Sequence, residues 1–194
     1  MPSPRDIIRR SAEAAVKKIE GAGGGNPRVL LHTEAGDIVI EVYPEKAPVT
    51  AANFLRYVDA GLYDGTAFFR TVTMDNQPGN QVKIEVIQGG QVAEAKEFPP
   101  VAHETTRATG LRHTDGAVSM ARSAPGSAAS SFFICINDQP ELDFGGRRNP
   151  DGQGFAAFGR VVSGMDIVRK IHKLPAEGQQ LVPAVRILAV KRVR

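Results

Sequence analysis

The spacing of apolar residues has a period of two at both ends of the main segment of the chain. Over residues 28–42 apolar side chains alternate with polar ones, and residues 34–37 interrupt the alternation with turn-forming types. This pattern predicts a β-hairpin over residues 28–42. The alternation returns over residues 184–193, where it predicts a final strand.

Two segments have a helical spacing instead. The first, residues 50–60, ends before Gly61 and carries four apolar side chains on one face: Ala51, Phe54, Leu55 and Val58. The second begins with Ser163-Gly164-Met165-Asp166, which resembles a capping box and predicts that Ser163 caps a short helix reaching His172. Each segment is long enough for only one packed helix.

Short apolar runs bounded by Gly, Pro, Asn or Asp lie between these two segments. They occupy residues 67–72, 82–88, 116–120, 131–136 and 155–162. Several short strands with few helices indicate a sandwich or a closed barrel rather than a βαβ protein.

The first 27 residues form a separate region. Residues 3–20 combine a serine cap, a proline at the first helical position and a narrow apolar stripe, which together predict an amphipathic helix. The glycine-rich residues 21–27 read as a flexible linker. We therefore expect an appendage over residues 1–27 and a β-rich domain over 28–194. The charged residues of the appendage are interpreted as a solvent-exposed surface, and docking to a membrane or a partner is the alternative.

Composition narrows the function classes. A chain of 194 residues with 42% hydrophobic residues fits one domain with a small extension. A formal charge of +3, with both signs mixed along the chain, argues against nucleic acid as a partner. The single cysteine, Cys135, excludes an internal disulfide, and the four histidines show no metal-ligand spacing. We expect neither a metal nor another cofactor.

Targeting signals are absent from the sequence as written. It has no apolar run of about 18 residues and no secretory signal core near its start. These features favour a cytoplasmic protein that does not enter the membrane. A periplasmic location would apply if a signal peptide had been removed. We expect a monomer.

Five short motifs occur in a fixed order and carry the most specific information. They are FFR at 68–70, QGG at 88–90, AVSMAR at 117–122, SSFFI at 130–134 and AFGRVVSGM at 157–165. In this order they resemble the cyclophilin-type peptidyl-prolyl cis/trans isomerases, closest to the bacterial branch, over about residues 28–193. The resemblance implies a closed eight-stranded antiparallel β-barrel capped by two α-helices. It also implies a substrate groove on the outer face of the barrel.

The activity implied by the resemblance is rotation about Xaa-Pro peptide bonds in folded or unfolded polypeptides. The partial double-bond character of the amide sets a barrier of about 18–20 kcal/mol. In the twisted transition state the prolyl nitrogen regains a lone pair, which a fixed N–H donor stabilises. By resemblance, Arg70 is this donor, Gln88 forms a hydrogen bond with either Arg70 or the substrate carbonyl, and Phe133 forms part of an apolar proline pocket.

The resemblance also implies a set of substrate-binding residues: Val86, Ala121, Arg122, Ser131, Leu142 and Phe155. Phe132 and Phe133 are adjacent on one strand and must face opposite sides, so Phe132 is assigned to the core. Without the resemblance, Arg70 would be interpreted as a surface residue, and Leu142 and Phe155 as core residues. Gln88 would then simply terminate a strand.

Three acidic or polar residues depart from the family pattern. Ser131 replaces a substrate-facing glutamine, Glu85 stands near the place of an aromatic wall residue, and Glu141 replaces a tryptophan. They motivate an alternative hypothesis, a non-catalytic proline-peptide-binding or chaperone module that uses the same groove. Residues 138–154 predict an exposed loop, and its pair Arg147-Arg148 serves either to attract acidic client segments or only for solubility.

Overall fold

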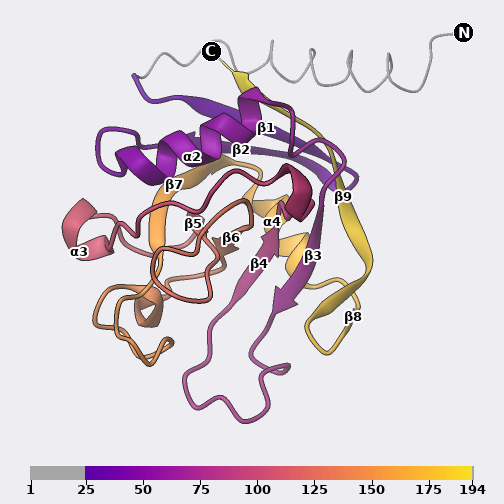
Figure 1. The fold of residues 1–194 in the computed structure, drawn as a ribbon. Coiled ribbons are helices and arrows are strands. Elements are labelled where there is room, and N and C mark those ends of the chain that lie inside the picture. The colour runs from indigo at the N-terminus through magenta and orange to yellow at the C-terminus, as the bar shows by residue number, and fades with distance from the viewer. Residues whose placement is uncertain (1–24, 194) are drawn as a thin grey trace, which may run out of the picture.

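The computed structural model describes residues 25–193, so the predicted helix at residues 3–20 lies outside the described part of the chain. Nine strands in this part form one antiparallel sheet in the order β1-β2-β7-β5-β6-β4-β3-β9-β8 (Figure 1). Their bounds are β1 Arg28–Thr33, β2 Gly36–Val42, β3 Ala67–Val72, β4 Val86–Gly89, β5 Ala117–Met120, β6 Phe132–Cys135, β7 Ala156–Ser163, β8 Ala176–Glu177 and β9 Gln180–Val193.

The sheet closes on itself because β1 pairs with β9 as well as with β2. Eight strands make up this barrel, and the two-residue strand β8 pairs with β9 outside it. The predicted closed eight-stranded barrel is therefore confirmed. Closure leaves few unpaired strand edges, which is how barrels avoid pairing with other chains.

Two longer helices pack on the barrel at the predicted places. Helix α2, Pro48–Asp59, lies against β7 and β9, and α4, Met165–His172, lies against β2, β3 and β4. Three shorter elements were not predicted: α3 Thr106–Thr109 and the 3₁₀ turns Glu94–Lys96 and Pro140–Leu142. Among residues 25–193, no helix combines the length and apolar character that a membrane crossing requires.

The predicted cap of the second helix was wrong. The N-cap residue of α4 is Gly164 rather than Ser163, and it makes no side-chain cap hydrogen bond. Gly164 has φ +92°, and a side chain there would collide with the backbone of Asp37 on β2. The chain needs this close approach, so Ser163 remains the last residue of β7 and does not cap the helix.

The alternation of β6 separates two apolar clusters. Phe132 and Ile134 point into the barrel and belong to its main core. Phe133 and Cys135 point to the outer face, where they join a smaller cluster with Val72, Ile84, Val86, Ala117 and Leu142. The assignment of Phe132 to the core is confirmed, and the outer cluster is the surface on which the candidate site forms.

Candidate active site

A cavity of about 120 Å³ opens on the outer cluster. Eight of the nine site residues derived from the sequence line it, together with Ile84: Arg70, Val86, Gln88, Ala121, Arg122, Phe133, Leu142 and Phe155. They come from β3, β4, β6, the segment after β5, the Pro140–Leu142 turn and the residue before β7. The barrel therefore brings together residues that lie far apart in the sequence.

The wall of the cavity is apolar and well packed. The rings of Phe133 and Phe155 meet edge to face, with centroids 5.2 Å apart and planes at 86°. Leu142 is fully buried beside them, although the loop that carries it was predicted to be exposed. A pocket of this kind excludes water from a small apolar ring.

Glu85 does not stand in the wall. The residues of β4 and the segment before it alternate, so Ile84, Val86 and Gln88 share the face that lines the cavity. The carboxylate of Glu85 points elsewhere and accepts a hydrogen bond from Asn137 at 3.3 Å. Glu85 was expected near the place of a wall residue, but the neighbouring residue Ile84 takes that place and completes the apolar wall.

A bulge in β3 turns Arg70 toward the cavity. Phe68 is buried in the core. Phe68 and Arg70 are two residues apart, so on a regular strand Arg70 would also point into the core. The register shifts between them, with Phe68 opposite Gly89 and Arg70 opposite Gln88. The extra residue re-aims the strand, as β-bulges do near functional sites, so the guanidinium lies on the outer face.

Two glutamines hold the Arg70 guanidinium. Its Nε and Nη2 donate to Oε1 of Gln179 at 3.0 and 2.7 Å, and its Nη1 donates to Oε1 of Gln88 at 2.9 Å. These bonds take three of the five N–H groups of an arginine. One N–H on each terminal nitrogen is left for a substrate. Burial lowers the pKa of Arg70, and the nearby charge of Arg148 lowers that pKa further.

Sequence reasoning missed Gln179. This residue lies between β8 and β9, 109 positions from Arg70, and its Nε2 donates to the backbone oxygen of Asn76 at 3.1 Å. No local motif marks it, because its role depends on a long-range strand pairing.

Ser131 lies beside the cavity rather than in it. Its hydroxyl accepts a hydrogen bond from Nε2 of Gln88 at 2.9 Å. It lines a neighbouring cavity of about 280 Å³, which shares Gln88, Ala121 and Arg122 with the first. The structure thus places Ser131 behind Gln88, where its short side chain orients the glutamine.

The Arg122 side chain packs inward. It is 2% exposed, pairs with Asp151 at 2.9 Å and donates to the backbone oxygen of Gly154 at 2.6 Å. Its guanidinium lies 5.2 Å from the centre of the Phe155 ring. Arg122 therefore fixes one wall of the cavity, and its hydrogen bonds lower the pKa of Asp151.

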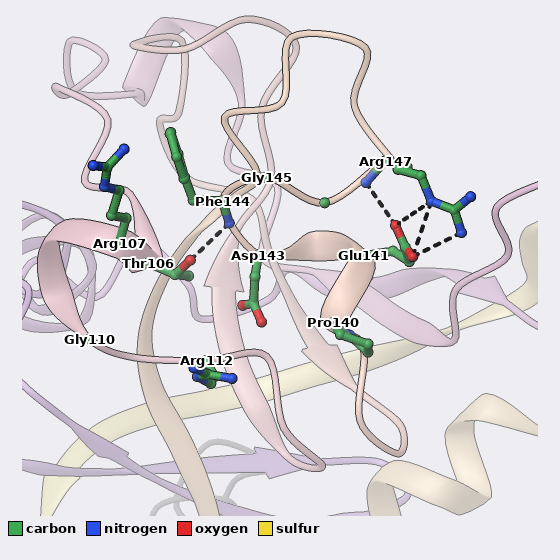
Figure 2. A pocket seen from close by; sticks show the side chains of 11 residues that line it. Thr106, Arg107, Gly110, Arg112, Pro140, Glu141, Asp143, Phe144, Gly145 and Arg147 are labelled. Atoms are coloured by element: carbon green, nitrogen blue, oxygen red, sulfur yellow. Dashed lines mark hydrogen bonds and ion pairs between the residues drawn. The ribbon is translucent and has the colours of Figure 1, made fainter.

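A larger cavity of about 650 Å³ is lined in part by Pro140 and Glu141 of the Pro140–Leu142 turn (Figure 2). It contains none of the nine predicted site residues. Figure 2 shows Glu141 at its rim, joined to Arg147 by hydrogen bonds of 2.8–3.3 Å. Over residues 25–193, no three His, Cys, Asp or Glu side chains gather in a way that could hold a metal ion.

The comparisons with known proteins agree with this geometry. A family model described as "Cyclophilin type peptidyl-prolyl cis-trans isomerase/CLD" matches residues 28–192. The chain therefore belongs to the cyclophilin-type family of peptidyl-prolyl cis-trans isomerases, and it is an enzyme of that class.

Two bacterial relatives show the extent of the similarity. Peptidyl-prolyl cis-trans isomerase A of Dickeya dadantii is 40% identical over 153 residues, which cover 77% of this chain and 73% of the relative. Peptidyl-prolyl cis-trans isomerase B of Escherichia coli is 38% identical over 144 residues, which cover 74% and 82%. The resemblance to the bacterial branch is confirmed.

Solved structures support the fold. A crystal structure of a Cryptosporidium parvum cyclophilin-type isomerase aligns with a TM-score of 0.70 at 20% identity, over 87% of this chain and 98% of that one. A second crystal structure of the same protein, in the presence of the dipeptide Ala-Pro, aligns with a TM-score of 0.66.

Proposed function

We propose that this protein accelerates rotation about Xaa-Pro bonds by a non-covalent mechanism, with Arg70 as the donor to the prolyl nitrogen. The proline ring occupies the wall formed by Phe133, Leu142 and Phe155. The single observation that carries the proposal is that Arg70 and these apolar side chains line one cavity. Proline-containing polypeptides are the substrates in this proposal, and the structural neighbour crystallised in the presence of the dipeptide Ala-Pro supports it.

The chemistry follows from the change in charge at the amide. Resonance places positive charge on the nitrogen of the planar amide, and twisting returns the lone pair to that atom. The two remaining N–H groups of Arg70 attract this lone pair and repel the planar form, so the interaction is stronger in the transition state. Its partial burial strengthens the effect, because a donor in a dry groove competes with less water.

The apolar wall contributes in a second way. The planar amide is more polar than the twisted one, and a groove that excludes water penalises the planar form more. Phe133 is only 5% exposed and is packed on Phe155, so the proline ring meets a rigid surface. A rigid surface holds the ring while the preceding residue rotates.

Exchange NMR on an Ala-Pro peptide tests the proposal. We expect Arg70→Ala to reduce the enzyme-catalysed exchange rate by about 10²–10³, the loss typical for removal of a transition-state donor. Phe133→Ala should reduce it by at least about tenfold, because the pocket loses its central ring. Arg147→Ala, which removes an exposed arginine outside the cavity, is the control.

Two outcomes would contradict the assignment. Wild-type rates in a folded Arg70→Ala variant would remove the arginine from the mechanism. Peptide-induced shifts of the amides of Arg70 and Phe133 without any exchange enhancement would instead favour the alternative, a module that binds proline segments without turnover.

A further inference from the structure

Two guanidiniums stand near one end of the groove with only neutral hydrogen-bond acceptors. Arg70 donates to Gln88 and Gln179. Arg148 uses Nη1 to donate to Oε1 of Gln77 at 3.0 Å and to the backbone oxygen of Val82 at 2.7 Å. Amide oxygens satisfy the N–H groups but do not neutralise the two positive charges.

The Arg148 guanidinium is held in place by a clamped loop. This loop, residues 73–85, joins β3 to β4 and hangs below the barrel in Figure 1. Gln77 is 2% exposed and closes the loop, because its Nε2 donates to the backbone oxygens of Thr73 and Ile84 at 2.7 and 2.8 Å. The Ile84 N–H donates back to Gln77 at 3.1 Å. Ile84 lines the groove, and Gln77 bonds to both Ile84 and Arg148. Gln77 therefore connects Arg148 to the wall of the groove.

The charges near this end stay uncompensated within residues 25–193. Burial lowers the pKa of Arg148, and the charge of Arg148 in turn lowers the pKa of Arg70. Neither guanidinium forms an ion pair with a carboxylate of this part of the chain: Glu141 pairs with Arg147, and Glu85 accepts a hydrogen bond from Asn137. Two like charges in a partly dry region repel each other, and an anion between them would be favoured.

Beyond Arg70 the groove continues into the cavity that contains Ser131, and the two cavities share Gln88, Ala121 and Arg122. The family resemblance implies that the backbone at Ala121 and Arg122 pairs with the residue before proline, and we place the substrate accordingly. The residues after proline then leave the groove past Ile84, toward Arg148.

We propose that Arg148 is a specificity-determining residue that favours substrates with an acidic side chain in the first or second position after proline. The inference rests on the proposed function and adds a substrate class to it. The paired arginines at 147 and 148 thus differ in their surroundings. Arg147 pairs with Glu141 on the surface, whereas Arg148 donates to the loop that carries Ile84 of the groove wall.

The test compares Ala-Ala-Pro-Xaa-Ala peptides in which Xaa is Glu, Gln or Lys, and a second set with Xaa one position later. For the wild-type protein at low salt we expect kcat/KM from exchange NMR to be roughly fivefold higher with Glu than with Lys in one of the sets. About 0.5 M salt should bring the ratio toward one, because the pair is partly exposed. Arg148→Gln should abolish the preference, and Arg148→Lys should retain most of it. Arg107→Gln, at an exposed arginine over the Phe144 ring and outside the groove, is the matched charge control and should leave the preference unchanged.

Several results would overturn the inference. One is a wild-type enzyme that treats all peptides alike, and another is an Arg148→Gln variant with the wild-type ratio. Equal loss of rate on every peptide with an unchanged ratio would mean that Arg148 only holds the loop. Peptide dissociation constants from amide shifts are measured in parallel. If no peptide is isomerised but binding still depends on Arg148 and Glu, the proposed catalysis fails while the charge preference stands.

Discussion

The imidazole of His113 lies nearly parallel to the phenyl ring of Phe133, with ring centroids 5.9 Å apart and planes at 14°. The ring is 1% exposed and is held at both nitrogens, by Asp143 Oδ1 at 2.7 Å and by Ser119 Oγ at 2.9 Å. Phe155 contacts Phe133 as well. Phe133 is therefore packed between a fixed imidazole and a second phenyl ring, and His113 serves as a positioning residue.

Replacement of His113 should affect both stability and catalysis. We expect His113→Ala to lower the free energy of unfolding by about 2–4 kcal/mol, because it opens a cavity and leaves Asp143 and Ser119 without their partner. Urea unfolding measures this loss. In the folded variant kcat/KM should fall several-fold, since Phe133 loses its backing. His32→Ala, on β1 and outside the groove, is the control, and full activity of a folded His113→Ala protein would count against this role.

Gln179 should matter for catalysis through Arg70. It accepts from two nitrogens of that guanidinium, so Gln179→Ala frees the arginine to adopt other rotamers. We expect about a tenfold lower kcat, equivalent to about 1.4 kcal/mol, with little change in KM, because the lost interaction acts in the transition state. Gln180→Ala, an exposed neighbour, should behave as wild type. A change in KM alone would contradict the assignment.

The outline of the fold follows from local patterns in the sequence. Alternation located β1, β2 and β9, and short apolar runs bounded by turn residues located β3 to β7. The opposite faces of Phe132 and Phe133 followed from their adjacency on β6. The ordered motifs contain five of the eight predicted residues that line the cavity, and each motif lies on a strand or at its end. The family resemblance that the motifs carry supplied the other three, Val86, Leu142 and Phe155.

The remaining features depend on contacts that no local pattern records. The bulge that turns Arg70 outward arises from pairing with β4 and β9. Gln179 bonds to Arg70 although the two residues are 109 positions apart. The contact of His113 with Phe133 depends on the pairing of β5 with β6. The wrong prediction that Ser163 caps α4 also has a long-range cause. The close approach of β2 to Gly164 overrides the local capping signal.

Asp143 should make the protein sensitive to acid. Burial alone would raise the pKa of its carboxyl, but hydrogen bonds from the His113 ring and backbone lower that pKa overall. The stabilisation is present above the unfolded pKa, about 3.9, and is lost as the pH falls through the lower folded value. Asp143→Asn should therefore flatten the dependence of the unfolding free energy on pH below about 4, measured by urea titration. Asp75→Asn, on an exposed loop, should leave the slope unchanged, and an equal slope for both variants would refute the prediction.

Gly90 of the QGG motif should be much less replaceable than Gly79. It has φ +74°, and an added Cβ would overlap the Phe132 ring. Gly79 has a similar φ of +81° but nothing within 4 Å of an added Cβ. We expect Gly79→Ala to cost about 1 kcal/mol from backbone strain alone. Gly90→Ala should cost at least about 2 kcal/mol more, because the core must shift as well. Equal urea midpoints for the two variants would show that Phe132 can move aside. Packing of the barrel would then not explain the glycine at position 90.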